Sequence, residues 1–448
     1  MGVVKVKLKF KSLSILMILT TVLFTFLAPG HVQAEQTIEL EAESAILVDA
    51  ETGKILYSKN ADIALPPASM TKMMTEYLVW EAIESGEISW DQTTQISEYA
   101  YQISANPSFS GIGLQQDKDY TVKSLYQAMA INSDNATTIA LAELIAGSEG
   151  EFVRRMNEKG EELGLPEFKF VNSTGLENES LGDNYPEGTD PNGVNLLSAR
   201  SAALLAYHLV TDYPESLEVS SIPEIEFDDR LIRNYNWMLP HETTYLEQYH
   251  YEGVDGLKTG FTTLAGYCFT GTAEVNGKRL ITVVMKTESE DARFKETARL
   301  LDYGFNHFES TVIIPSGYQL EEESTLPISK GKEKEVEIAL KDGFTFPVFP
   351  GDENNYTVEY EIDESVLNEK GQLEAPIEAG TVVGKAKLVY TGEKDEGFIY
   401  DGNQDTVDLV TVDAVEKSNW FMIMIGAIGE FFANLFSTIV DTVTGWFS

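Results

Sequence analysis

The chain reads Pro66-Pro67-Ala68-Ser69-Met70-Thr71-Lys72-Met73-Met74 across residues 66–74, and this stretch predicts where the first long helix of the fold begins. After the prolines, apolar side chains recur at the spacing of one helical face: Met70, Met73, Met74, Tyr77 and Leu78. We therefore expect Ser69 to open a helix, where free backbone N–H groups and the positive end of the dipole favour developing negative charge. Lys72 follows one turn later, on the same side as Ser69.

Ser69 and Lys72 together suggest a serine nucleophile and an amine base. A lysine acts as a base near neutral pH only if burial or a nearby cation lowers its pKa, and Lys258 is a candidate for that cation. The structural alternative is a serine that caps the helix and a lysine that reaches out to solvent.

Two further short motifs follow Ser69-Met70-Thr71-Lys72 in order, namely Ser133-Asp134-Asn135 and Lys258-Thr259-Gly260. The three motifs supply two hydroxyls, two amines and an amide, which is nearly a full set for acyl transfer through a serine ester. Each motif alone is weak, because Ser-x-x-Lys recurs at Ser329–Lys332 and Ser-x-Asn at Ser104–Asn106. Only the ordered set is informative.

Ser133-Asp134-Asn135 falls between two apolar-rich stretches with helical character, residues 122–131 and 136–145. In the functional interpretation, Ser133 relays a proton and Asn135 holds a substrate amide. The structural alternative is a turn followed by a helix cap, since all three residue types favour those positions.

Lys258-Thr259-Gly260 belongs to a run with strand character, and residues 266–285 read as two strands joined at Asn276-Gly277. Asn-Gly between such runs is a strong hairpin signal. A glycine in an edge strand lets a ligand backbone approach and add as a further strand, with Lys258 and Thr259 facing its carboxylate. The alternative is an ordinary charged strand end.

With these motifs placed, the chain resembles the serine D-alanyl-D-alanine carboxypeptidases of the penicillin-binding protein 5 type. The resemblance covers about residues 42–308 and includes three more segments: Phe170-Val171-Asn172-Ser173-Thr174-Gly175-Leu176, Ala265-Gly266-Tyr267-Cys268 and Leu301-Asp302-Tyr303-Gly304-Phe305. The β-rich stretch and terminal helix that follow also match that family's layout.

The resemblance implies a reaction and a role for each motif residue. Ser69 is the nucleophile that attacks the peptide bond between two terminal D-alanines of a peptidoglycan pentapeptide, and β-lactam antibiotics inhibit by acylating it. The other implied site residues are Lys72 as base, Ser133 as proton relay, Asn135, Lys258, Thr259, Gly260 and Arg293 as substrate-binding residues, and the backbone N–H groups of Ser69 and Phe261 as the oxyanion hole. No cofactor or metal is implied. For Arg293 the alternative is a surface arginine paired with Glu290 or Asp291.

Residues 1–34 read as an export signal. Lys5, Lys7, Lys9 and Lys11 form a basic start, residues 13–27 are apolar, and Val32-Gln33-Ala34 offers small residues for cleavage. A signal anchor is the alternative, although the apolar run is short for a membrane span. We expect an exported enzyme on the outer face of the bacterial cytoplasmic membrane.

The mature chain divides into three predicted parts. Residues 35–309 form the catalytic domain, with an opening hairpin at 44–59 that turns at Thr52-Gly53, helices in the middle and strands after Gly253. Strands at both ends with helices between them indicate an α+β fold, a mainly antiparallel sheet flanked by helices, of the β-lactamase/transpeptidase-like type. Residues 310–412 show short alternating strands and predict a small all-β domain.

Residues 413–448 form a predicted C-terminal amphipathic helix. One stripe carries Phe421, Ile425, Ile428, Phe432, Leu435, Ile439, Val443 and Trp446. Glu430 and Asn434 would fall at the centre of a membrane span, so we expect a helix that lies in the membrane surface as a peripheral anchor. The alternative is a helix that packs on the protein's own core.

Composition excludes some classes of function. The formal net charge of −40 becomes −44 once the four lysines of the leader are removed, and this argues against a nucleic-acid partner. Cys268 is the single cysteine, so no intramolecular disulfide can form, and we interpret it as a small buried residue. The five histidines show no metal-ligand spacing.

Two competing functions stay open at this point. A class A β-lactamase shares the three motifs, but it needs Glu-x-x-Leu-Asn to activate water, and no match lies between Asn135 and Lys258; Glu162-Leu163-Gly164-Leu165 is followed by Pro166. A non-catalytic penicillin-binding receptor is the other, although a binder has no use for a proton relay.

Overall fold

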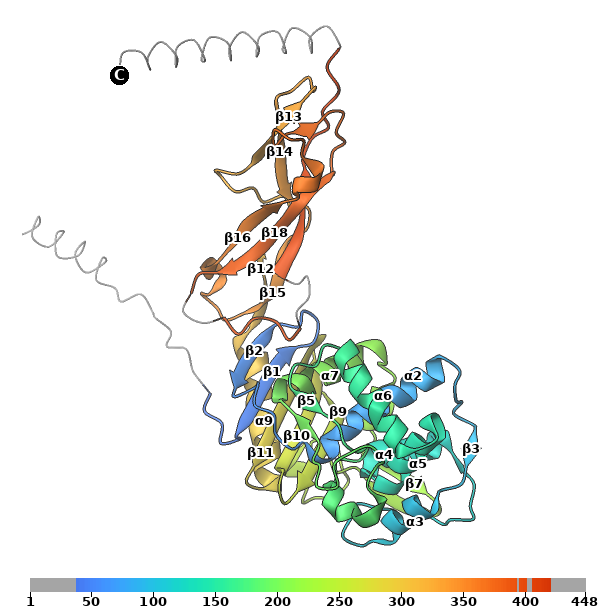
Figure 1. Cartoon of the computed structure of the whole chain (residues 1–448). Helices are drawn as coiled ribbons and strands as arrows, with labels where there is room; N and C mark the ends of the chain where they lie inside the picture. Colours follow the sequence, from blue (N-terminus) through green and yellow to red (C-terminus); the bar gives the residue numbers. More distant parts are fainter. Residues whose placement is uncertain (1–37, 393–394, 401–404, 420–448) are drawn as a thin grey trace, which may run out of the picture. The chain divides into compact units, whose positions relative to one another are not determined.

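The computed structural model describes residues 38–392, 395–400 and 405–419 (Figure 1). The expected leader, residues 1–34, and residues 420–448 of the expected C-terminal helix lie outside the described residues. Among the residues that are described, no helix is long and apolar enough to cross a membrane.

A five-stranded sheet with the order β2-β1-β11-β10-β9 forms the centre of the N-terminal region of the described chain (Figure 1). Every neighbouring pair in it is antiparallel. The strands are β1 (Ser44–Asp49), β2 (Ile55–Lys59), β9 (Val254–Thr262), β10 (Gly266–Val275) and β11 (Lys278–Thr287). The predicted α+β class is therefore confirmed, and the strand with Lys258-Thr259-Gly260 lies at one edge of the sheet.

Tight turns set the two hairpins, as the sequence indicated. Asn276 and Gly277 have φ values of 54° and 80°, and they connect β10 to β11. This left-handed pair matches the twist of the strands, which explains the Asn-Gly signal. The opening hairpin turns at Thr52-Gly53, where the Gly53 N–H donates to the Asp49 carbonyl oxygen at 2.9 Å.

Helices cover both faces of the sheet. Ile46 and Val48 of β1 join the large core cluster that includes α7 (Ala199–Asp212). Leu47 points to the other face, where α9 (Glu290–His307) packs; a Cβ built on Gly304 of α9 would lie 2.9 Å from a Leu47 methyl carbon. Successive residues of a strand face opposite sides, so two covered faces require the continuous apolar run that β1 shows.

The helical region lies on the side of β9 and surrounds α2 (Lys72–Glu84). The stripe of apolar residues predicted a helix with one buried face, but α2 is buried on nearly all sides, with Thr75 and Glu76 enclosed too. Its neighbours include α4, α5, α6, α7 and β9, so little of the helix surface is left for water. The other helices here are α3 (Glu98–Ala105), α4 (Val122–Asn132), α5 (Asn135–Ala146), α6 (Glu149–Glu162) and α8 (Ser216–Ser220).

The C-terminal region consists of strands, as predicted. A six-stranded sheet has the order β16-β18-β19-β14-β13-β17, and β12 pairs with β15. The strands are β12 (Glu309–Ile314), β13 (Thr325–Ser329), β14 (Glu335–Leu340), β15 (Phe344–Val348), β16 (Tyr356–Ile362), β17 (Leu373–Glu374), β18 (Val382–Tyr390) and β19 (Thr406–Thr411).

The end of this β region falls later than residue 412. Val415 is buried in the core of the β region, and its backbone exchanges hydrogen bonds with Ile377 at 2.9 Å in both directions. Lys417 forms a further bridge with Gly331. Residues 413–417 therefore extend the β region rather than begin the helix, because the apolar side chain at 415 fills the β core.

Candidate active site

Ser69 lies in a short 3-10 helix, Ala68–Thr71, that leads directly into α2. The preceding Ala68 has a φ of 48°, a left-handed conformation that costs a non-glycine residue about 1–3 kcal/mol. Two glycines hold this backbone from opposite parts of the chain. A Cβ on Gly175 would lie 1.9 Å from the Ala68 carbonyl oxygen, and one on Gly260 would lie 2.4 Å from that of Pro67.

Lys72 is fully buried and points its amine back at Ser69. Nζ lies 3.0 Å from Ser69 Oγ, 2.8 Å from Asn135 Oδ1 and 2.7 Å from the Thr174 carbonyl oxygen. The sequence placed Ser69 and Lys72 on one side of a helix start, and the structure brings their polar atoms into hydrogen-bonding distance. Lys72 does not reach solvent, so the alternative interpretation for this lysine is wrong.

The surroundings of Lys72 favour its neutral form. Burial is the main cause that lowers the pKa of Lys72 well below its usual value, and the positive charge of Lys258 lowers it further. The carboxylates of Asp134, Glu76 and Glu149 act in the opposite direction. A neutral amine is what a base requires at moderate pH.

Ser133-Asp134-Asn135 forms the connection between α4 and α5, as the sequence predicted. Ser133 takes a left-handed conformation after α4, and Asp134 caps α5 by accepting from the Thr137 N–H at 2.6 Å. Ser133 is buried, yet its Oγ has no hydrogen-bond partner among the described residues. A buried hydroxyl without a partner is costly, and this one is available to bond a molecule that enters the site.

Asn135 contacts Lys72 directly. Its Oδ1 accepts from Lys72, and its Nδ2 donates to the Ser110 carbonyl oxygen at 3.1 Å. The sequence analysis expected Asn135 to hold a substrate amide. In the structure the amide oxygen already accepts from Lys72 and one N–H is bonded to Ser110, so a contact with substrate would use the second N–H or the second lone pair of the oxygen.

Lys258 is a second buried amine in the same region. Its Nζ donates to the Thr259 carbonyl oxygen at 3.3 Å. Burial lowers the pKa of Lys258 to about 8, opposed by the Glu76 carboxylate. Gly260 packs against the segment before Ser69, and a side chain there would collide with the Pro67 carbonyl oxygen.

Arg293 lies at the start of α9 and is 3% exposed, so it is not a surface arginine. It donates to the Glu290 carboxylate at 2.8 Å, as the alternative interpretation expected, and to the Gly260 carbonyl oxygen at 3.3 Å. Its Nε has no partner among the described residues, and burial lowers its pKa to about 10. A buried cation with an unused donor next to Gly260 fits an anionic ligand group.

Phe261 and Cys268 flank this region. Phe261 is 50% exposed, and its ring stacks on Tyr267 with centroids 4.3 Å apart. Cys268 is fully buried, and burial raises its pKa to about 11, which fits its interpretation as a small core residue. No cluster of three or more His, Cys, Asp or Glu side chains suited to a metal occurs in the described part of the chain.

Sequence reasoning assigned no role to the turn Asn172–Gly175, although it quoted this segment. The turn supplies the Thr174 carbonyl oxygen to Lys72 and lies against Ala68 through Gly175. The signal available in the sequence was the glycine, whose φ of 90° excludes most other residues. A backbone carbonyl has no residue type, so no motif could have revealed it.

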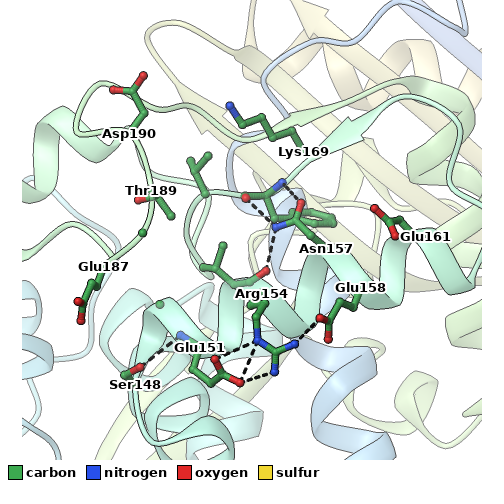
Figure 2. Close-up of a pocket in the computed structure, with 15 residues that line it drawn as sticks. Ser148, Glu151, Arg154, Asn157, Glu158, Glu161, Lys169, Glu187, Thr189 and Asp190 are labelled. Carbon is green, nitrogen blue, oxygen red and sulfur yellow. Dashed lines mark hydrogen bonds and ion pairs between the residues drawn. The ribbon is translucent and has the colours of Figure 1, made fainter.

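A cavity of about 640 Å³ lies elsewhere, between α6 and the loop 187–190 (Figure 2). None of the predicted site residues lines it. Figure 2 shows Arg154 bonded to both Glu151 and Glu158, and Asn157 bonded to the backbone around it. The cavity is therefore separate from the site built around Ser69 and Lys72.

Comparison with protein families and solved structures places this site in a known context. Residues 31–289 match the family model described as D-alanyl-D-alanine carboxypeptidase, and residues 308–417 match that of the penicillin-binding protein 5 C-terminal domain. The D-alanyl-D-alanine carboxypeptidase DacF of Bacillus subtilis is 32% identical over 80% of this chain and 85% of its own. DacC of Escherichia coli is 31% identical over 89% of this chain and 91% of its own.

Solved structures agree with these matches. A peptidoglycan synthesis regulatory factor (PBP3) from Streptococcus pneumoniae superposes with a TM-score of 0.65 at 35% identity, covering 84% of this chain and all of that one. Penicillin-binding protein D2 from Listeria monocytogenes, in its cefotaxime-bound form, covers 61% of this chain and 100% of its own at 32% identity and a TM-score of 0.52. This chain therefore belongs to the D-alanyl-D-alanine carboxypeptidase family, with the penicillin-binding protein 5 type of C-terminal domain.

Proposed function

We propose that this protein is an exported serine DD-carboxypeptidase that removes the terminal D-alanine from peptidoglycan pentapeptide stems through an acyl-enzyme on Ser69. Family membership supports the carboxypeptidase activity on peptidoglycan and the binding of β-lactams. The observation that carries the mechanism is the geometry at Lys72, a fully buried amine with three polar neighbours.

The first step follows from the hydrogen-bonding capacity of a neutral amine. Such an amine has two N–H donors and one lone pair. Asn135 Oδ1 and the Thr174 carbonyl oxygen can only accept, so they take both N–H groups. The lone pair then faces the Ser69 hydroxyl, 3.0 Å away, and removes its proton as Oγ attacks the carbonyl carbon of the penultimate D-alanine.

The attack creates a tetrahedral oxyanion. The backbone N–H groups of Ser69 and Phe261 are proposed to stabilise it. Loss of one such donor typically costs roughly 100- to 1000-fold in rate. Because the donors are backbone groups, their placement depends on the approach of β9 to the Ser69 helix rather than on the Phe261 side chain.

The substrate carboxylate and the leaving amine are assigned to the remaining groups. Lys258, Thr259 and Arg293 would bind the terminal carboxylate beside Gly260, and the unused Arg293 Nε supports this assignment. Ser133 would pass the proton from Lys72 to the amine of the departing D-alanine. Its hydroxyl lacks a partner in the described residues, as a relay that pairs with substrate should.

Hydrolysis of the ester completes the cycle. Once the proton has left through Ser133, Lys72 is neutral again and can take a proton from the attacking water. It returns this proton to Ser69 Oγ as the ester bond breaks, which releases the shortened peptide and restores both Ser69 and Lys72. A β-lactam would acylate Ser69 in the same way, by opening of its ring amide. The cefotaxime-bound form of the related protein D2 is consistent with this proposal.

Export and membrane attachment are proposed from the sequence pattern alone. Residues 1–34 would direct export, and the amphipathic stretch within residues 413–448 would hold the enzyme at the outer membrane surface. Eight large apolar side chains, each worth about 1.5–3 kcal/mol on burial, outweigh the repulsion of two acids from anionic lipid, about 1 kcal/mol each.

The β-lactamase alternative is disfavoured by the position of Glu162. This residue ends α6, is exposed, and pairs with Lys159 at 2.6 Å, so it is not a buried carboxylate that activates water. The receptor alternative is disfavoured by the contact of Ser69 with a buried amine, which a binding protein does not need.

One experiment separates these functions. The purified protein is incubated with a pentapeptide ending in D-Ala-D-Ala and, separately, with a penicillin; Ser69→Ala is the control. Released D-alanine, lost in the control, supports the carboxypeptidase. Rapid turnover of penicillin without D-alanine release would support a lactamase, and stable acylation alone would support a receptor.

A further inference from the structure

The carbonyl oxygen of Thr174 is one of the two acceptors that orient Lys72, and its position depends on a fully buried turn. A turn lies outside any helix or sheet, so its buried backbone groups must find their hydrogen-bond partners in other parts of the protein. Asn172, Ser173 and Thr174 have no exposed surface. Three side chains from distant elements bond the turn: Thr75 of α2, which donates to the Ser173 carbonyl oxygen at 2.9 Å, Glu149 and Asn195. None of them belongs to the three motifs, and the last two make the larger number of contacts.

Glu149 holds the turn from the start of α6. It is 4% exposed, and its Oε1 accepts from the Ser173 N–H at 2.9 Å and from the Ser173 hydroxyl at 2.6 Å. Its Oε2 accepts from the Tyr99 hydroxyl at 2.9 Å. Every contact is one in which Glu149 accepts, and the hydrogen bonds from Ser173 and Tyr99 favour the ionised carboxylate. Burial acts in the opposite direction and raises the pKa of Glu149.

Asn195 connects the turn to the helix start that carries the nucleophile. Its Oδ1 accepts from the Val171 N–H at 2.6 Å and from the Asn172 N–H at 3.1 Å. Its Nδ2 donates to Thr71 Oγ1 at 3.0 Å, and Thr71 lies directly before Lys72. The turn and the base are therefore fixed to each other through one amide.

We propose that Glu149 and Asn195 are positioning residues for acyl transfer, because they hold the Thr174 carbonyl oxygen where it orients the Lys72 amine toward Ser69. The proposal rests on the proposed function of Ser69 and Lys72. If the carbonyl moves away, one N–H of the amine loses its acceptor and the lone pair can turn from Ser69. Misplacement of a reacting group by about 1 Å can cost on the order of 100-fold in rate.

Glu149 also acts on Lys72 through its charge. The pH dependence of the acylation rate therefore distinguishes this role from a purely structural one. The groups that face Lys72 are Glu76 on its own helix, Asp134 before α5, Glu149 on α6 and Lys258 on β9. The Glu149 carboxylate raises the pKa of Lys72, so its removal lowers that pKa further. The acid limb of a pH–rate profile then moves to lower pH, even as the plateau falls.

The test compares Glu149→Gln with Glu143→Gln. Glu143 is a partly buried acid on α5 that accepts from Ser97 Oγ at 3.0 Å and has no hydrogen bond to the turn. The rate of acylation by a fluorescent penicillin is measured between about pH 5 and 10, with thermal unfolding alongside. We expect Glu149→Gln to lower the plateau about 10- to 100-fold and to shift the acid limb to lower pH. Glu143→Gln should keep the wild-type plateau.

Two milder variants keep the test decisive if Glu149→Gln does not fold. Ser173→Ala removes one of the three hydrogen bonds that Glu149 accepts. Asn195→Asp removes the donor to Thr71 and to the Asn172 carbonyl oxygen while keeping the acceptor for Val171. Both should lower the plateau, and Ser173→Ala should leave the acid limb in place because no charge changes. Folded variants with wild-type plateaus and limbs overturn the positioning role. A wild-type protein that is not acylated at all overturns the proposed function instead.

Discussion

At the scale of single residues, the central feature is that several buried titratable side chains surround the amine of Lys72. Burial alone penalises the charged form of Lys72, and Lys258 adds to that effect. Glu76 lies one turn after Lys72 and is enclosed with it; burial raises its pKa to about 7 despite the two lysines. Enzymes commonly tune catalytic groups in this way, through burial and neighbouring charges.

Replacement of Lys72 by methionine keeps the bulk of the side chain and removes the base. We expect the rate of acylation by penicillin to fall about 100- to 10,000-fold, the usual contribution of general base catalysis. Lys159→Met is the matched control, because Lys159 is also a largely buried lysine but pairs with Glu81 and Glu162. An equal loss in both variants would contradict the assignment of Lys72.

The raised pKa of Glu76 predicts how stability depends on pH. Its usual value of 4.5 applies to the unfolded chain and about 7 to the folded one, so the folded state holds the proton more strongly. This contribution to the free energy of unfolding is present below about pH 4.5 and is lost as the pH rises through 7. Urea unfolding of the wild type and Glu76→Gln at pH 5 and 7.5 checks this. The wild type should lose more stability than the variant over this interval.

At the scale of elements, the site depends on how closely three segments approach one another. The Ser69 helix start, the edge strand β9 and the turn Asn172–Gly175 meet where glycines allow backbone contact. The hairpin at Asn276-Gly277 and the helices on either side of Ser133 could be predicted, because their signals are local. The Thr174 carbonyl and Asn195 could not, because their roles arise only when distant segments pack together.

Gly175→Ala tests this close approach. The substitution brings a Cβ to 1.9 Å from the Ala68 carbonyl oxygen, next to the nucleophile. Gly188→Ala is the control, because Gly188 has a similar φ of 85° with no neighbouring atom within 4 Å. Strain at such a φ costs about 1–2 kcal/mol in both, and crowding adds about 1–3 kcal/mol in Gly175→Ala alone. In urea unfolding, Gly175→Ala should have a lower free energy of unfolding than Gly188→Ala, and penicillin should acylate it more slowly.

At the scale of the whole molecule, the proposed attachment to membranes and the strong acidity concern parts of the chain outside the candidate active site. Val415 is buried in the β core, Lys417 bridges to Gly331, and the Ser418 N–H donates to the Lys330 carbonyl oxygen, so a deletion meant to remove only the predicted anchor should keep residues up to Ser418. The net charge, −44 without the leader, sets the field in which an anionic substrate approaches.

Deletion of residues 420–448 should release the enzyme from membranes without loss of carboxypeptidase activity. Membrane sedimentation of the wild type and the truncated chain measures this. Ile428→Asp with Leu435→Asp, on the apolar stripe, should have the same effect, whereas Ser437→Asp on the other face should not. A truncated chain that still sediments with membranes would refute the anchor.

The acidity predicts a response to salt. Peptidoglycan is anionic, so repulsion should slow its binding at low ionic strength, and screening by salt should raise kcat/KM. We infer adaptation to an alkaline or saline exterior. A salt titration with an anionic muropeptide and a neutral acyl-D-Ala-D-Ala peptide checks this. A flat profile for the anionic substrate would count against the idea.

By itself, the sequence determined which groups are available: the order of the three motifs, the hairpins and the alternating strands, all of which rest on local periodicity and turn chemistry. Only the tertiary structure decided which of these groups are buried and which atoms they face. It buried Lys72, aimed a backbone carbonyl at its amine and left Ser133 Oγ and Arg293 Nε without partners among the described residues. The physical reason is that burial and hydrogen-bond direction are properties of segments packed together, which residue identity and spacing along the chain do not encode.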